Sequence, residues 1–291
     1  MKTINLLASC LLTTTVVCAA EIRTVKELHN SLKAKYPDQI ENKPGVTINR
    51  TPPERDKIVR EILGERQQKL KGETGPEIQF TTKDGSQKRL SDLRGKPVIL
   101  IFFLSQAIGS CKSHDGILEG LKQNGPKLAG EGIPVILVEP IMYQGASEEI
   151  KEQIKETGRK KLGDPYYTGT AYSTDTKYEY DWGVYGFPAS FIIDGYGKVS
   201  HLPADTSKNK SAQEITTCIN LIDALPPAPP AFFQSREITD TNGRKLSGTI
   251  LEKSETAIKF RKSDGKEFDI PIKNLSAADQ QFIKECQAAA P

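Results

Sequence analysis

The sequence predicts an α/β domain followed by a small all-β module. Three apolar runs rich in β-branched residues alternate with helix-compatible stretches, at residues 98–104, 133–139 and 190–193. Such runs are typical of a central sheet that helices cover on both faces. Beyond a proline-rich spacer, Asn242-Gly243 and Asp264-Gly265 mark hairpin turns between short strand-like runs. The 291 residues are enough for these two domains.

The first twenty residues have the pattern of a secretory signal. Lys2 is followed by a mostly apolar segment from Ile4 to Val17, and Cys18-Ala19-Ala20 precedes the charged Glu21. The apolar segment is short and rich in Thr for a membrane span. We therefore predict export to the periplasm or cell envelope, with residues 1–20 removed and no membrane span left. An uncleaved N-terminal anchor is the alternative.

A second processing pattern overlaps this segment. Leu7-Ala8-Ser9-Cys10 resembles a bacterial lipoprotein box, in which Cys10 would be lipidated. Almost no apolar core would then precede the cleavage point, so cleavage near residue 20 is the favoured prediction.

Shifts in composition divide the rest of the chain into four segments. Residues 21–72 are charged and predict a helical N-terminal extension with a Pro- and Asn-rich break. Residues 73–225 form the predicted α/β domain. The prolines at 226–233 favour a stiff, extended linker. Residues 234–291 form the β module, which ends in a helix that Ser276 is expected to cap.

Composition and motif content exclude several functional classes. A net charge of +3, spread along the chain, does not favour nucleic-acid binding. His29, His114 and His201 are dispersed and have no metal-ligand spacing with the cysteines. The sequence contains no glycine-rich phosphate loop and no Ser/His/Asp arrangement. We therefore expect no metal and no cofactor.

Removal of the signal would leave three cysteines, Cys111, Cys218 and Cys286. An odd, small number of cysteines does not form a disulfide framework, so any redox role rests on individual thiols. Cys218 falls on the expected core side of a closing helix. Cys286 lies in the C-terminal tail, where it could pair between two chains.

Several segments carry a resemblance to a known family. Leu90 to Val98 leads into the first apolar run, Gly186-Phe187-Pro188 precedes another, and Phe191 to Asp194 is followed by Gly197-Lys198-Val199. In this order they resemble the thioredoxin-like, thiol–disulfide and peroxiredoxin-related ("redoxin") family. The resemblance implies a thioredoxin-like fold, a cis-proline loop at Pro188, and a Cys-x-x-Cys pair after the strand.

The pair itself is incomplete in this chain. Placed without a gap on the family pattern, Cys111 matches the second, resolving cysteine, and Ile108 stands where the attacking cysteine belongs. The attacking thiolate is stabilised at a helix N-terminus, and the second cysteine resolves the mixed disulfide. Without the first cysteine, ordinary dithiol exchange is not possible. Cys111 would then be an inert, small residue in a degenerate site.

Two alternatives keep Cys111 reactive. In the first, the register shifts so that Cys111-Lys112-Ser113-His114 is the active turn, and His114 replaces the resolving cysteine. A neighbouring Lys and His would lower the thiol pKa. In the second, Cys111 is a peroxidatic cysteine. Peroxiredoxins carry a hydroxyl residue and a proline where this chain has Ile108 and Leu104, and an arginine where it has Pro188.

A binding role is suggested by the residues before the proline loop. The stretch from Tyr172 to Tyr185 is rich in aromatic residues and includes Trp182. Together with Phe187 and Pro188 it could line a groove for an extended peptide or protein partner, because the loop backbone offers a strand edge. Packing of an inserted loop is the alternative. The leading prediction is a polypeptide-binding scaffold with weak or no oxidoreductase activity.

The C-terminal module resembles the Sla homology domain of endocytic adaptors. The matching residues are Arg236 to Asp240, Gly243-Arg244, Ile258 to Phe260, Asp264 to Lys266, Ile270 to Ile272, Leu275-Ser276 and Asp279-Gln280. The resemblance implies a small SH3-like barrel that binds short peptide motifs. Ile238 stands where the adaptors usually have an aromatic residue. A purely structural appendage is the alternative.

Overall fold

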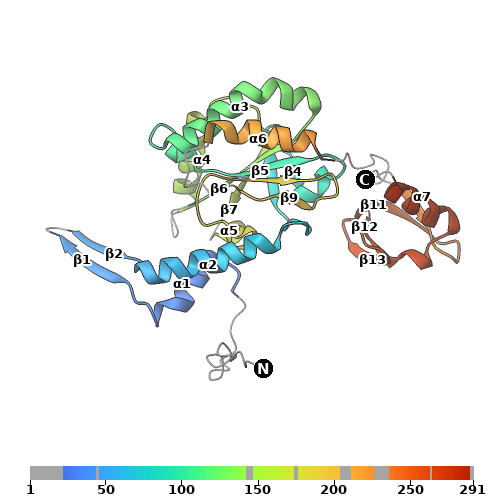
Figure 1. Cartoon of the computed structure of the whole chain (residues 1–291), viewed down its shortest axis with the longest axis horizontal. Helices are drawn as coiled ribbons and strands as arrows, with labels where there is room; N and C mark the ends of the chain where they lie inside the picture. The colour runs from blue at the N-terminus through green and yellow to red at the C-terminus, as the bar shows by residue number, and fades with distance from the viewer. Residues whose placement is uncertain are drawn as a thin grey trace, which may run out of the picture.

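The fold is that of a computed structural model, which describes residues 22–43, 46–141, 147–173, 176–203, 211–225, 236–262 and 264–288. Figure 1 shows an α/β body between an N-terminal helical region and a separate C-terminal module. The predicted signal at 1–20 and the predicted linker at 226–233 lie outside the described residues.

The α/β body is built on a seven-stranded mixed sheet in the order β4-β3-β7-β6-β5-β8-β9. The strands are β3 (Gln79–Thr82), β4 (Gln87–Arg89), β5 (Val98–Phe102), β6 (Val135–Pro140), β7 (Gly169–Ser173), β8 (Ala189–Ile193) and β9 (Val199–His201). Strands β5, β6 and β7 are parallel, whereas β8 runs antiparallel to β5. The predicted mixed α/β architecture is therefore confirmed.

Alternation along β5 divides the interior between the two faces of the sheet. Ile99 and Ile101 pack into one apolar cluster, and Leu100 and Phe102 into the other, because successive strand residues point to opposite faces. All five residues of β5 are buried. An apolar run with no polar alternation is what a strand covered on both faces requires.

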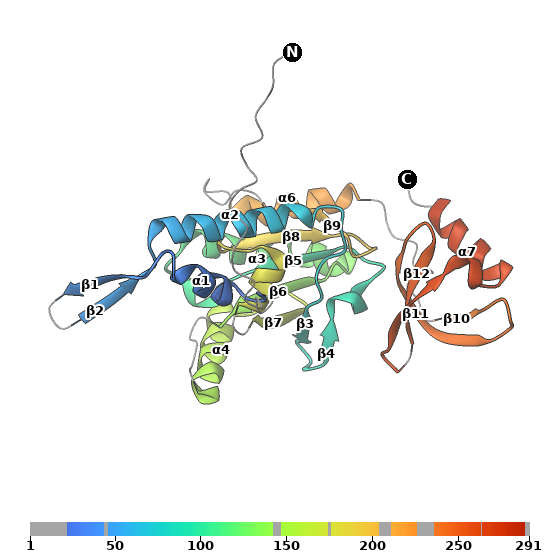
Figure 2. The ribbon, with the colours of Figure 1, turned by 90° about the horizontal axis from the view of Figure 1, so that it is seen from below.

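Helices cover both faces of the sheet. Helices α3 (Lys112–Glu131) and α6 (Ser211–Asp223) lie on one face, whereas α2 (Pro53–Lys69) and α5 (Lys177–Trp182) lie on the other (Figures 1 and 2). Helix α4 (Glu148–Leu162) connects β6 to β7. The short 3₁₀ turn η1 (Leu90–Leu93) precedes β5, and the turn η2 (Ser105–Ala107) follows it.

The N-terminal region differs from the expected helices with a break. Helix α1 (Val25–Lys33) and α2 are separated by an antiparallel hairpin of β1 (Gln39–Lys43) and β2 (Val46–Arg50), which projects from the body in Figure 1. The proline-rich ends of this segment obscured its strand character. Leu28, Val59 and Leu63 form a small cluster against Tyr180 and Tyr185, so this region packs on the α/β body.

The C-terminal module is an antiparallel meander with one helix. Its elements are β10 (Arg236–Thr239), β11 (Lys245–Lys253), β12 (Ala257–Lys262), β13 (Glu267–Pro271) and α7 (Ala277–Ala288). The Ser276 hydroxyl accepts from Asp279 N–H at 3.2 Å, which confirms the predicted cap of the terminal helix. Ile283 of α7 joins Ile258 and Phe260 in the module core.

The prediction of a closed SH3-like barrel is wrong for the strands that the structure describes. They form an open sheet in the order β10-β11-β12-β13, in which the two outer strands do not pair with each other. Among these described residues, the isolated bridge between Asp240 and Leu275 extends the pairing a little further. Because α7 covers the apolar face, the core is enclosed without closure of the sheet.

Within the described part of the chain, no helix combines the length and apolar character that crossing a membrane requires.

Candidate functional site

The candidate site lies at one end of the central sheet. Phe102, at the end of β5, pairs with Ala189, at the start of the antiparallel β8. The segment that leaves β5 towards Cys111 and the loop that enters β8 through Pro188 therefore lie at the same sheet end. The peptide bond between Phe187 and Pro188 is cis, in agreement with the cis-proline loop that the resemblance implies.

Cys111 occupies the N-cap position of α3, immediately before the first helical residue. Its carbonyl oxygen accepts from His114 N–H at 3.0 Å and Asp115 N–H at 3.1 Å. The residue is partly exposed, and its thiol makes no capping hydrogen bond. The turn before it is held by Gly109 N–H, which donates to Asp115 Oδ1 at 2.7 Å.

This helix register bears on the role of Cys111. An N-cap residue lies beside the unpaired amides and the positive end of the helix dipole, which is where an attacking thiolate is stabilised. A resolving cysteine belongs one turn further on, and that position holds His114. The N-cap position of Cys111 is compatible with the shifted register, in which Cys111 comes first.

His114 does not act on the thiol in this arrangement. Its side chain is only 2 % exposed, and neither ring nitrogen has a hydrogen-bond partner in the described structure. The ring packs against Phe103, with 5.2 Å between the ring centroids. Burial lowers the pKa of His114, while Asp115 acts in the opposite direction. The imidazole is thus a core group, and no hydrogen bond connects the two predicted catalytic residues in the described structure.

No second described thiol lies at the site. Cys218 is fully buried on α6 among Ile215 and Ile219, and burial raises the pKa of its thiol. The prediction that Cys218 packs in the core is confirmed. Cys111 and Cys218 are both free thiols. The side chain of Cys286 lies outside the described residues.

Trp182, which the sequence predicts to line a peptide groove, is buried in the structure. The indole is 0 % exposed and packs against Phe191 and Phe102, with ring centroids 5.0 Å and 6.3 Å away. The aromatic stretch around it serves the contact with α2, where the guanidinium of Arg66 lies 4.3 Å from the centroid of the Tyr180 ring. Sequence could not distinguish an aromatic groove from an aromatic core.

The proline loop itself remains partly accessible. Gly186 is exposed, and Phe187 is half-buried against one of the two core clusters of the sheet. Pro188 is buried beneath them. Any partner at this loop would therefore meet the backbone around Gly186 and the outer face of Phe187.

Parts of the chain are similar in sequence to known proteins. No protein-family model matches the chain. The thiol:disulfide interchange protein DsbE of Allochromatium vinosum is 48% identical over 42 residues, which cover 14% of this chain and 23% of that protein. The thiol:disulfide interchange protein HelX of Rhodobacter capsulatus is 27% identical over 109 residues, which cover 38% of this chain and 53% of that protein. Over these residues the central domain is similar to thiol:disulfide interchange proteins. The matches span from about a quarter to about half of these relatives.

Solved structures also align with about half of the chain. The exposed lipoprotein thioredoxin Etrx1 of Streptococcus pneumoniae has a TM-score of 0.38 and 21% identity, covering 52% of this chain and 100% of that one. The thioredoxin domain of a thiol-disulfide oxidoreductase from Bacteroides vulgatus has a TM-score of 0.37 and 17% identity, covering 52% and 97%.

The α/β domain positions the Cys111 segment through a partly buried acid that sequence reasoning missed. Glu139, near the end of β6, accepts from Ser105 N–H at 3.1 Å and also from the Ser105 hydroxyl. Burial raises the pKa of Glu139, against the hydrogen bonds from Ser105 and the charge of Arg159. Ser105 begins η2 (Ser105–Ala107), which leads to Cys111. A charged residue at the end of an apolar run was the signal for this contact.

Gly158 of α4 provides the space for this contact. An added Cβ there would lie 2.2 Å from Ser105 Oγ. We predict that Gly158→Ala lowers the free energy of unfolding by about 1–3 kcal/mol, because the inserted methyl displaces Ser105. Denaturant unfolding measures this. Gly130→Ala is the matched control, since that helical glycine has open space around it and should gain up to about 1 kcal/mol. Equal stability of the two variants would contradict the packing described.

The register of the degenerate pair is also testable. We predict that His114→Cys, which adds a thiol one helical turn after Cys111, creates a redox-active pair. We expect Ile108→Cys to do so less well, because Ile108 lies outside the helix and packs on the core. The measurements are intramolecular disulfide formation in a glutathione buffer and insulin reduction, with the wild type as control. Greater activity of Ile108→Cys would show that Cys111 is the second cysteine of the pattern.

Proposed function

We propose that this chain is an exported thioredoxin-like protein that binds extended polypeptide and has weak or no thiol–disulfide activity. The observation that carries the proposal is the isolation of Cys111: among the described residues no second thiol lies beside it. Residues 1–20, whose pattern is that of a secretory signal, support export.

The chemistry of exchange explains why one thiol is not enough. A thiolate that attacks a substrate disulfide forms a mixed disulfide and releases one substrate thiolate. A second thiol must then attack Cys111 Sγ or its partner sulfur to complete turnover. Cys218 is buried on α6, and the position one turn after Cys111 holds the buried His114. The described part of the chain therefore offers no resolving thiol at this site.

Polypeptide binding would use the accessible part of the proline loop. Gly186 is exposed and Phe187 half-buried beside it, so backbone pairing and an apolar contact are both available to an extended chain. The C-terminal module, through its resemblance to the Sla homology domain, would supply a second surface. A cavity of about 550 Å³ there is lined by Ile238, Leu246 and Phe268, together with Arg244 and Lys262.

A single-thiol enzyme is the second candidate. Its support is the N-cap position and partial exposure of Cys111, which favour a thiolate. In this reaction Cys111 would attack a substrate disulfide, and a low-molecular-weight thiol from solution would resolve the mixed disulfide. A peroxidase role for Cys111 has less support, because Ile108, Leu104 and Pro188 stand where the peroxiredoxin pattern has polar residues or proline.

A thiol measurement separates the two candidates. For the binding scaffold we predict that Cys111 alkylates at neutral pH no faster than a free thiol of ordinary pKa, and that the protein does not accelerate insulin reduction by dithiothreitol. Cys111→Ser identifies the signal, because the buried Cys218 should react only after denaturation. Alkylation at least about tenfold faster than the reference thiol, with turnover that Cys111→Ser abolishes, would establish the enzyme instead.

Polypeptide binding needs its own test. We predict that a fluorescent, reduced and alkylated insulin B chain binds the wild type, and that Phe187→Asp weakens this binding roughly tenfold, or about 1.4 kcal/mol. Cys111→Ser should leave the affinity unchanged. Ile40→Asp, at an exposed site on the N-terminal hairpin, is the control for a lost apolar side chain. No binding by the folded wild type would contradict the proposal.

A further inference from the structure

The C-terminal module meets the thioredoxin-like domain at a junction with an apolar contact at its centre. Tyr196, in the turn between β8 and β9, is partly buried against the module core of Ile258, Phe260 and their neighbours. Asp194 orders this turn, because its Oδ1 accepts from Tyr196 N–H at 2.9 Å and from Lys198 N–H at 2.8 Å. A side chain of one domain thus completes the core of the other.

Arg261 of β12 forms ion pairs at the same junction. Its side chain is only 13% exposed. Its guanidinium lies 2.5 Å from Asp92 Oδ1 and 3.7 Å from Glu77 Oε2, and it donates to the Ser91 hydroxyl, all in the thioredoxin-like domain. Within the module it lies 2.8 Å from Glu267 Oε1. One guanidinium therefore joins acceptors from both domains.

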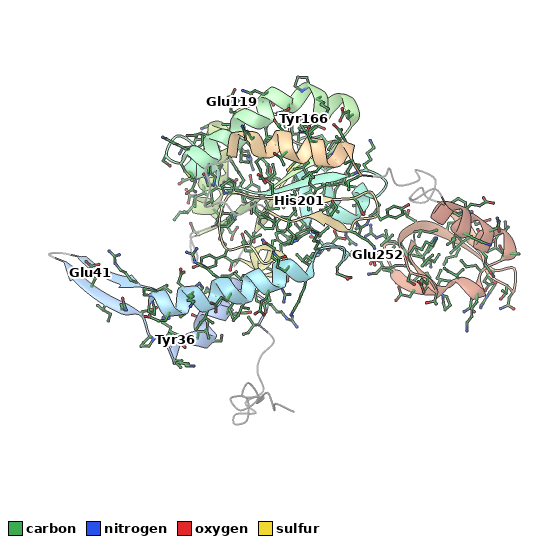
Figure 3. All side chains as sticks on the ribbon, viewed as in Figure 1. Tyr36, Glu41, Glu119, Tyr166, His201 and Glu252 are labelled. Atoms are coloured by element: carbon green, nitrogen blue, oxygen red, sulfur yellow. The ribbon has the colours of Figure 1, made fainter. Side chains whose placement is uncertain are left out.

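Weaker pairs extend the same junction. Arg94, whose side chain is 8% exposed, lies 4.0 Å from Glu252 of the module, and Arg89 lies 4.0 Å from Glu267. Figure 3 shows Glu252 at the boundary between the two parts. A cavity of about 560 Å³ lies between the two domains. Its lining includes the four side chains Arg89, Arg94, Glu252 and Glu267. Charged groups of both domains thus surround the Tyr196 contact at the junction.

The geometry points to a charge-dependent latch: the module docks on the thioredoxin-like domain through Arg261, and high ionic strength releases it. Removing one partner of a largely buried ion pair leaves an uncompensated charge, which is costly. Salt screens this network through its carboxylates, because the side chains of Asp92 and Glu77 are 37% and 43% exposed. Polar junctions between domains permit relative motion. The latch involves no residue of the proposed binding site and goes beyond the proposed function.

The position of the latch has a structural consequence. Asp92 lies in η1 (Leu90–Leu93), which leads into the start of β5, whereas Cys111 comes after the end of that strand. The module therefore docks at the sheet end opposite the proline loop. While the latch is closed, the loop and the module cavity are held at a fixed separation. Release allows them to move independently.

Small-angle scattering from the full chain tests the latch. We expect the wild type to be compact at low salt, and its radius of gyration to rise by roughly a tenth or more as salt reaches about 1 M. Arg261→Glu should show the larger radius already at low salt. Asp92→Arg combined with Arg261→Glu should recover part of the compaction, because the charges are exchanged. Arg244→Glu is the control, since Arg244 pairs with Asp240 inside the module.

The outcomes are decisive in both directions. Circular dichroism establishes that each variant is folded, and Arg261→Gln replaces Arg261→Glu if charge reversal prevents folding. A radius that neither salt nor the Arg261 variants change would overturn the latch. Equal expansion in the Arg244→Glu control would also overturn it, because the effect would then come from net charge alone.

Discussion

The antiparallel pairing of β5 with β8 is the constraint on which the rest of this structure depends. It buries two apolar strands at the centre of the sheet and places the end of one beside the start of the other. Cys111 and Pro188 are far apart in sequence but reach the same sheet end for this reason. The opposite ends of the same strands carry η1 and the Tyr196 turn, which receive the C-terminal module.

The candidate site combines a helix N-terminus at Cys111, a cis-proline loop and a partly buried acid that holds Ser105. One helical turn after Cys111, the buried imidazole of His114 packs on Phe103. Under the proposed function, this scaffold would keep a place for an extended chain without a resolving thiol at the site.

The two ends of the sheet have different physical character. At the Cys111 end the contacts lie within one domain, as in the pair of the buried Ser105 and the partly buried Glu139. At the other end, charged side chains of two domains meet around one tyrosine. The proposed latch makes the docking of the module sensitive to salt, whereas the contacts described at Cys111 are not exposed ion pairs. Conditions that open the junction are therefore not expected to disturb the site.

The sequence by itself determined the α/β architecture and the cap of the last helix, because continuous β-branched runs and Ser276 act through local chemistry. It also predicted that the thiol pair is incomplete. Tertiary structure decided the rest. Only packing showed that Trp182 is core, since an aromatic run has the same pattern in a groove and in an interior. Helix register, not spacing in sequence, placed Cys111 at the N-cap. The module sheet stays open because α7 covers its apolar face, a long-range contact that turn signals do not encode.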